Sequence, residues 1–145
     1  MSVLDEALTY VLANTTGFKA GSSTSAGVPI YLSRMPPNQI DTAVSLYEPG
    51  GAPPLGTLSD SVPTAERPRI QIYSRSPSFQ TARNNTQAIW DAFYSLRNTS
   101  IAKTGSTGKT LWQLAEPINS PTDIGRDANE RNIVTADIQV TKEIS

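Results

Sequence analysis

The sequence predicts an α+β domain, a mainly antiparallel sheet of about five strands with two helices packed on one face and long loops between them. Three observations support this. Residues 2–13 and 77–97 repeat apolar residues at helical spacing. Other segments alternate apolar and polar residues, as half-buried strands do. No strand–helix–strand unit recurs at regular spacing, which argues against a parallel sheet. We expect residues 1–145 to form a single domain with one core.

The N-terminal half is expected to contain one helix and two strands. The helix at residues 2–13 has an acidic first turn, which suits the positive end of a helix. Its apolar stripe is Leu4, Ala7, Leu8, Val11 and Leu12. Residues 28–32 and 42–47 are predicted strands. Residues 14–27 and 48–67 are rich in glycine, proline and polar residues, so we predict irregular loops there.

Residues 66–97 are expected to be the framework of the domain. The strand at residues 68–75 directs Ile70 and Ile72 to one face. Ser76 is a suitable helix cap, and Pro77 suits the first turn. The stripe of the following helix is Phe79, Ala82, Ile89, Trp90, Phe93 and Leu96.

Two further strands are expected in the C-terminal third. After an irregular segment at residues 98–109, the strand at residues 110–116 should place Trp112 and Leu114 on one face. Residues 118–132 read as irregular, and residues 132–143 show the cleanest alternation in the chain. The predicted core includes Leu8, Ile70, Ile72, Trp90, Phe93, Val134 and Ile138.

The composition argues against most enzyme classes. The chain contains no cysteine and no histidine, which removes thiolate chemistry, most hydrolase triads and most zinc sites. The net charge is −1 and no basic run indicates a nucleic-acid groove. The N-terminus is acidic where a signal peptide would be basic, and the longest apolar run is far too short to span a bilayer. We therefore expect no membrane association and a protein made in a cytoplasm.

Two segments resemble ligand motifs but depart from them. The stretch from Gly105 to Thr110 ends like a phosphate-binding loop, yet Lys103 stands where the first glycine belongs. It also precedes a strand instead of a helix, so a connecting loop is the better interpretation. A calcium loop that begins at Asp127 fails at Arg131 and Asn132. Carboxylates on the predicted helices (Asp5, Glu6 and Asp91) are expected on solvated faces.

The segment at residues 48–67 is either a surface loop or an arm that becomes ordered against a partner. Its seven glycine and proline residues favour the arm slightly, because proline lowers the entropy cost of ordering. Arg67 and Arg69 lie where this segment enters the central strand. Arg67 and Arg126 are suited to ion pairs within the fold or across a subunit boundary, or to a plain surface role.

Taken in order, several segments resemble the tail terminator (tail-completion or minor capsid) proteins of long-tailed bacteriophages. The resemblance rests on the N-terminal helix and on LSRMP at 32–36, VSLYE at 44–48, PGGAP at 49–53, ERPRIQI at 66–72, AIWDAF at 88–93, GRD with Asn129 at 125–129, and the terminal strand. It covers nearly the whole chain, and the order and spacing of the segments carry it.

The resemblance implies a structural virion protein without catalysis or cofactor. Its subunits would form a hexameric ring that caps the tail tube, stops tube growth and provides the tail-side surface for head joining. Partners would be a second copy, the tube protein and neck proteins, and DNA would cross the lumen without sequence-specific binding. Candidate contact residues are Glu48, Arg67, Arg69, Arg126 and Asp127. Alternatives are a head-closure or other neck protein, a soluble adaptor, and a nucleotide-binding protein.

Overall fold

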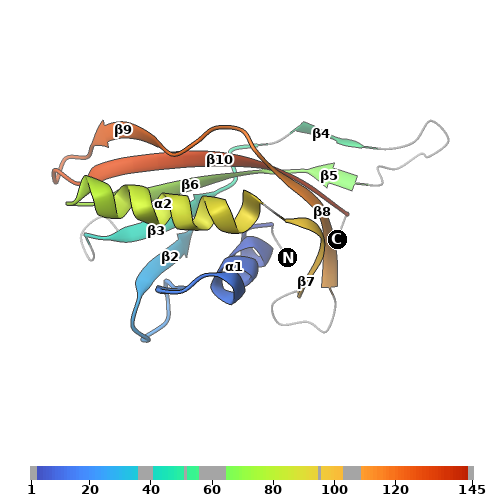
Figure 1. Ribbon diagram of the computed structural model, residues 1–145, viewed down its shortest axis with the longest axis horizontal. Coiled ribbons are helices and arrows are strands. Elements are labelled where there is room, and N and C mark those ends of the chain that lie inside the picture. The colour runs from blue at the N-terminus through green and yellow to red at the C-terminus, as the bar shows by residue number, and fades with distance from the viewer. Residues whose placement is uncertain are drawn as a thin grey trace.

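In the computed structural model, residues 3–35, 41–50, 52–55, 65–94, 96–102 and 109–143 are described. Within these ranges, two helices and ten strands follow one another, and all ten strands join one curled sheet (Figure 1). The elements are α1 (Val3–Asn14), β1 (Phe18–Ala20), β2 (Val28–Leu32), β3 (Ala43–Tyr47), β4 (Ala52–Leu55), β5 (Ala65–Arg67), β6 (Arg69–Ser76), α2 (Phe79–Tyr94), β7 (Arg97–Ala102), β8 (Lys109–Pro117), β9 (Thr122–Arg126) and β10 (Asn132–Glu143).

The long strands β6 and β10 form the centre of the sheet. They pair antiparallel over residues 69–76 and 132–139. Beyond β6 lie β3, β2 and β1 in that order. The other edge of β10 is shared, because β9 pairs with residues 132–135 and β8 with residues 138–142. Among the described strands, only the β1–β2 and β2–β3 pairs are parallel, so the predicted mainly antiparallel sheet is confirmed.

The expected number of about five strands is wrong, because the described residues already form ten. The five additional strands are β1, β4, β5, β7 and β9, and they lie in segments predicted to be irregular. They are three to six residues long; among the described strands, β1, β4, β7 and β9 each have one partner strand, whereas β5 lies between β10 and β4. Such strands are held by backbone hydrogen bonds to a neighbour, and a polar edge strand needs no apolar alternation.

The strand–helix junction at the end of β6 differs from the expected one. Ser76 remains in the sheet, paired with Asn132, so it does not cap the helix. Ser78 takes that place, since its Oγ accepts a hydrogen bond from the Thr81 amide at 3.4 Å. The helix ends at Tyr94 instead of residue 97, because Arg97 already pairs with Leu114 in the β7–β8 hairpin.

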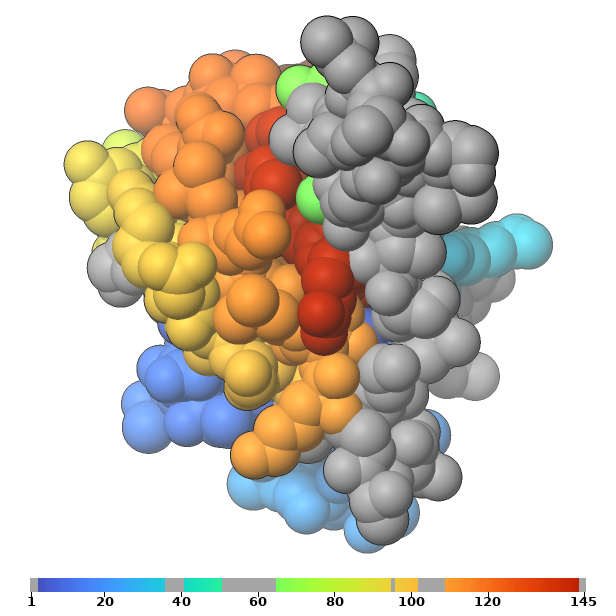
Figure 2. Space-filling model, turned by 90° about the vertical axis from the view of Figure 1, so that its right-hand side faces the viewer, coloured from blue at the N-terminus to red at the C-terminus, as the bar shows by residue number. Residues whose placement is uncertain are grey.

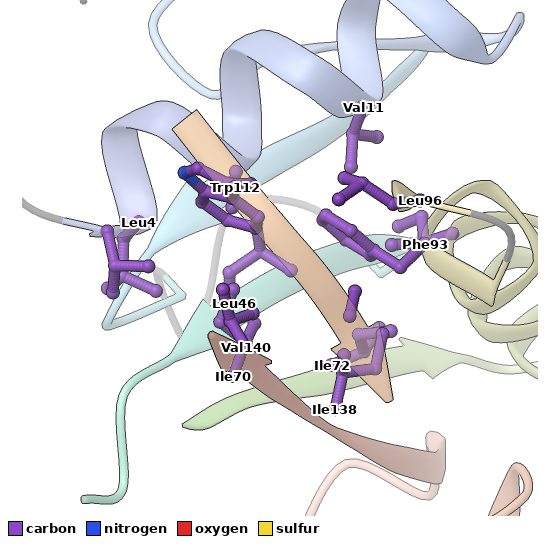
Figure 3. Close-up of a cluster of buried hydrophobic side chains, with 14 of the residues drawn as sticks. Leu4, Val11, Leu46, Ile70, Ile72, Phe93, Leu96, Trp112, Ile138 and Val140 are labelled. Atoms are coloured by element: carbon purple, nitrogen blue, oxygen red, sulfur yellow. The ribbon is translucent and has the colours of Figure 1, made fainter. Parts of the chain in front are cut away.

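One hydrophobic core lies between the two helices and a single face of the sheet (Figure 3). Phe93 is central to it, stacking on Tyr10 of α1 at 5.5 Å and on Trp112 of β8 at 6.2 Å between ring centroids. Burial raises the pKa of the Tyr10 hydroxyl, which donates a hydrogen bond to the Ala92 carbonyl at 3.1 Å. Of the predicted core residues, Ile70, Ile72, Phe93, Val134 and Ile138 are buried, whereas Leu8 and Trp90 are only partly buried.

Two expectations about the core are wrong. Trp112 is fully buried, but Leu114 does not share its face, because the register of β8 against β10 shifts between these two residues. A bulge of this kind reverses the side-chain alternation beyond it, and Ala115 is buried instead. Glu6, expected on a solvated helix face, is also fully buried. Figure 2 shows the side of the molecule on which β7 and β8 lie beside the end of β10.

Candidate assembly surface

The predicted contact residues do not form one cluster. Arg67 and Arg69 flank the β5–β6 junction, which lies beside the C-terminal part of β10. The exposed Glu48 follows β3 at the same end of the sheet. Arg126 instead pairs with Asn132 at the opposite end of β10. The seven residue steps of β10 from Asn132 to Gln139 span about 23 Å, so Arg126 lies far from Arg69 along the sheet.

Arg69 acts within the fold. Its guanidinium forms an ion pair and a hydrogen bond with Asp137 on the sheet face that points away from the helices. The Asp137 side chain is 6% exposed, and Asn119 donates a second hydrogen bond to it at 3.3 Å. The amide of Asp137 donates in turn to the Asn119 side-chain oxygen at 2.8 Å. This network holds the segment after β8 against the sheet.

Asp127 also makes intramolecular contacts, in the turn that joins β9 to β10. Its Oδ1 accepts hydrogen bonds from the amides of Asn129 and Arg131 at 2.9 and 3.0 Å. Its Oδ2 accepts one from Nε of Arg131 at 2.8 Å. Burial alone would raise the pKa of Asp127, but these hydrogen bonds and the arginine charge outweigh it, so the pKa is lowered. Asp127 therefore shapes the turn, while Arg126 beside it is exposed.

The exposed apolar residues identify a surface that sequence patterns did not predict. In the described part of the chain, the large hydrophobic side chains that are exposed are Phe79 (42%), Tyr94 (56%), Ile118 (47%) and Ile124 (58%). Trp90 joins them, since its ring packs on Tyr94 at 5.1 Å and its indole N–H donates to the Asn119 carbonyl at 3.0 Å. We refer to these five residues as the apolar flank.

Helical geometry explains why α2 contributes three aromatic rings to this flank. Residues 82, 86, 89 and 93 are buried against the sheet. At 100° per residue, Phe79, Trp90 and Tyr94 lie just beyond one side of that stripe. Ala92 lies beyond the other side, where Tyr10 of α1 contacts it. The apolar stripe of α2 is thus wider than the part of the helix surface that the sheet and α1 cover.

Strand β9 completes the apolar flank at the edge of the sheet. Among the described strands it pairs only with β10, and all five of its residues are exposed. Asp123 pairs with Val134 and Gly125 with Ile133, so Ile124 is an extra residue at a bulge. Gly125 adopts φ +109°, a conformation that favours glycine. A bulge redirects a side chain, and here it presents an exposed isoleucine on an open sheet edge.

The structure provides little basis for a ligand site at the sequence motifs. Lys109 and Thr110 begin β8, a strand, where a phosphate-binding loop would begin a helix. The remainder of that motif, from Gly105, lies outside the described residues, as does much of the arm predicted at residues 48–67. Within the described ranges, no group of three acidic side chains is placed to hold a metal ion. No helix there is long and apolar enough to cross a membrane.

A comparison with protein families gives one match that covers almost the whole chain. A family model described as bacteriophage tail terminator protein matches residues 11–144. The match includes the C-terminal part of α1, every strand, α2 and all five residues of the apolar flank. No curated protein matches the chain.

Proposed function

The chain belongs to the bacteriophage tail terminator family, as its sequence resemblance predicted, and is a structural protein of a phage tail. From that premise we propose that it forms a closed ring, with six copies as the expected number, that caps the tail tube and stops its growth. The ring provides the tail-side surface for head joining, and DNA crosses its lumen without sequence-specific contacts. It is assembled in the host cytoplasm and remains in the virion. No catalysis is required, because the function lies in the assembled shape.

The apolar flank is the observation that best supports this proposal. Aromatic side chains are enriched at protein interfaces, and an exposed apolar surface of this kind is typical of a contact site. Trp90 is held by Tyr94 and by a hydrogen bond to Asn119, so this aromatic pair presents apolar area at little entropy cost. Because they lie beside an open sheet edge, a single partner can cover both the helix flank and β9.

A second copy of the chain is the partner that the sheet geometry favours. The ladders connect one row of six residues across the sheet, namely Ala20, Ile30, Val44, Ser74, Val134 and Asp123. The edge strands β1 and β9 therefore lie level at opposite ends of that row. In Figure 1, β9 and β2, the neighbour of β1, lie on opposite sides of the molecule.

Strand directions agree with a head-to-tail contact between these edges. β1 runs parallel to β3, β10 runs antiparallel to β6, and β9 antiparallel to β10, so β1 and β9 run in opposite directions. A copy rotated about an axis along the strands would place its β1 antiparallel to β9. Such a contact joins two different surfaces of neighbouring copies. It forms a closed ring when the rotation angle between neighbours is a whole fraction of 360°.

Paired cysteine substitutions test this contact, since the chain has no cysteine of its own. The variant Lys19→Cys/Ile124→Cys is expected to form a ladder of oxidised oligomers that ends at the ring, as measured on non-reducing gels. Each single variant should give no ladder, because a head-to-tail contact brings Lys19 near Ile124 and not near itself. The matched control is Lys19→Cys/Asn84→Cys, which uses an exposed residue of α2 away from the apolar flank.

Electron microscopy of wild-type protein with tube protein tests the ring separately. Tubes that carry no terminal ring, and that elongate unchecked, would contradict the proposed function. Rings at tube ends, combined with no cross-link in the double cysteine variant, would keep the function and reject this contact. A dimer from Ile124→Cys alone would instead indicate a two-fold contact.

A further inference from the structure

The β1 edge of the sheet leaves part of the hydrophobic core incompletely covered. Five hydrophobic residues of α1, β1 and β2 pack against the core there but are only partly buried, namely Leu8, Leu12, Phe18, Val28 and Leu32. We refer to them as the open core edge. In Figure 1, α1 and β2 lie on one side of α2 and β9 lies on the other. The open core edge and the apolar flank therefore lie on opposite sides of one copy.

A hydrogen bond between the helices shows which way the two leucines of α1 point. The Tyr10 hydroxyl donates to the Ala92 carbonyl at 3.1 Å, so Tyr10 marks the side of α1 that meets α2. Leu8 and Leu12 lie two residues before and two residues after Tyr10. Since two residues turn a helix by about 200°, both leucines lie on the side of α1 that faces away from α2.

The same relation holds for the aromatic pair of α2. Trp90 and Tyr94 lie two residues before and two residues after Ala92, so they lie on the side of α2 that faces away from α1. The hydrogen bond from Tyr10 to Ala92 is at the middle of both pairs. The leucine pair and the aromatic pair therefore lie at the same level along the strands, and the two helices form a layer with apolar sides at both ends.

The strand register places Phe18 and Phe79 at a common level as well. Phe18 precedes Ala20 by two residues, and Ala20 lies in the row of the sheet that contains Ser74. Because β1 and β6 run in opposite directions, Phe18 lies level with Ser76. Phe79 begins α2 three residues after Ser76, within one helical turn. The open core edge and the apolar flank thus extend over the same part of the sheet.

The exposed area of the apolar flank indicates what its occupant must provide. Its four exposed members are 42–58% exposed, which corresponds to roughly 400 Å² at about 200 Å² for each large hydrophobic residue. A stable protein contact buries about 800 Å² on each partner, so the occupant must also cover the adjacent edge strand β9. The β1 edge of a second copy fits this requirement. Among the described strands, β1 pairs only with β2, and partly exposed hydrophobic residues lie beside it.

We propose that the open core edge of a second copy covers the apolar flank. A rotation about an axis along the strands keeps both helix layers on the same side of the joined sheet, so α1 of one copy follows α2 of its neighbour. Leu8 and Leu12 of one copy then pack against Trp90 and Tyr94 of the next. This helix contact rests on the proposed head-to-tail ring, and it adds a second layer to the contact between β1 and β9.

Cysteines on the two helices test this contact on the full-length chain mixed with tube protein. After oxidation, Leu12→Cys/Tyr94→Cys should give at least tenfold more cross-linked oligomer on non-reducing gels than the control Leu12→Cys/Asn84→Cys. Asn84 is exposed on α2 outside the apolar flank. Within one chain, positions 12 and 94 face away from each other, so a disulfide between them requires two copies. An equal yield from the two variants, or no oligomer from either, would overturn the proposal.

A charge exchange provides a second test that requires no cysteine. Leu12→Lys and Tyr94→Glu should each reduce the share of ring-capped tube ends in electron micrographs at least tenfold, because each places a charge in an apolar contact. The double variant should return to within threefold of the wild type, since the opposite charges meet between copies. Single variants that cap tubes normally would contradict the contact. Where Leu12→Lys does not fold, the cysteine pair decides.

The ring and the helix contact can fail separately. Wild-type rings at tube ends, combined with equal yields from the two cysteine variants, would keep the proposed function and reject the helix contact. Cross-linked oligomer from Leu12→Cys/Tyr94→Cys, combined with wild-type tubes that carry no terminal ring, would support the contact between copies and reject the proposed function.

Discussion

Lys142, near the C-terminal end of β10, forms a buried ion cluster that can be tested by removing its charge. Its Nζ lies 2.9 Å from Oε2 of Glu6 on α1 and 3.0 Å from Oε1 of Glu66 on β5. The indole N–H of Trp112 donates to the same Glu6 oxygen at 2.9 Å. The side chains of Lys142 and Glu6 are 1% and 0% exposed, whereas that of Glu66 is 37% exposed. We choose Lys142→Met, which retains most of the side-chain volume and removes the charge.

The expected loss follows from the charge that remains. Without Lys142, Glu6 is a buried carboxylate stabilised by one indole hydrogen bond, and breaking a buried pair in this way costs about 3–5 kcal/mol. Glu66 reaches solvent and loses less. For a slope of about 2 kcal/mol per molar urea, the midpoint of unfolding should fall by about 1.5–2.5 M. The double variant Glu6→Leu/Lys142→Met removes both charges and should return to within about 1 kcal/mol of the wild type.

Urea unfolding followed by the fluorescence of the two tryptophans and by circular dichroism measures these differences. Glu66→Gln is the matched control, with an expected cost of about 0–1 kcal/mol, because the carboxylate that it removes is partly exposed. If Lys142→Met lowers the free energy of unfolding by less than about 1 kcal/mol, the inference that Glu6 is left as a buried carboxylate without its cation is refuted. A double variant that loses as much as both single variants together would refute the coupling between the two charges.

Three further predictions concern the core, the β9–β10 turn and the parallel edge. Phe93→Ala should lower the free energy of unfolding by about 3–5 kcal/mol, measured by urea unfolding, since it leaves a cavity between Tyr10 and Trp112; a loss under about 1 kcal/mol would contradict this packing. The lowered pKa of Asp127 means that its carboxylate stabilises the fold above its unfolded value of 3.8, and that this stabilisation is lost as the pH falls through the folded value. The stability difference between wild type and Asp127→Asn should therefore shrink below about pH 4 in acid titrations, and a constant difference down to pH 2.5 would argue against the turn. Gly27→Ala should cost about 1–3 kcal/mol by thermal unfolding, because Gly27 has φ +130° and a Cβ would lie 3.0 Å from the Gly17 carbonyl oxygen; an unchanged melting temperature would be inconsistent with that backbone.

Local patterns were sufficient where one face of an element is buried along its whole length. The bounds of β2 and β10 were predicted to the residue, and both helices were predicted at nearly correct positions. In α2 the buried residues 82, 86, 89 and 93 follow the helical period, and in β10 the core residues Val134, Ala136, Ile138 and Val140 follow the strand period.

The five short strands lack such a period of apolar residues. β9 contains one large apolar residue, Ile124, and that residue is exposed. Its place in the sheet depends on backbone hydrogen bonds to β10, which any sequence compatible with an extended conformation can make. Gly125 was the one local signal of its bulge, and a glycine after three extended residues is equally typical of a turn.

The candidate contact residues were predicted by charge and position, and the structure separates them by what they touch. Arg69 and Asp127 have partners within the fold, at Asp137 and Arg131, whereas Glu48 and Arg126 are exposed. Trp90 was assigned to the core because it falls within the apolar period of α2. A helical period identifies an apolar stripe but not how much of its width is covered. The positions of the sheet and α1 in the fold show which edge of the stripe stays exposed.

The sequence by itself determined the fold class, the two helices, the two long strands β6 and β10, the family resemblance and the absence of cysteine and histidine. The helices and strands follow from residue types and from spacings within one element, whereas the fold class and the family resemblance follow from the order of segments along the chain. Tertiary structure alone decided which surfaces exist. It brought Glu6 and Lys142, 136 residues apart, into one buried pair, and it left Phe79, Tyr94, Ile118 and Ile124 exposed. Burial depends on which segments pack together, and that choice is made by long-range contacts which no local period contains.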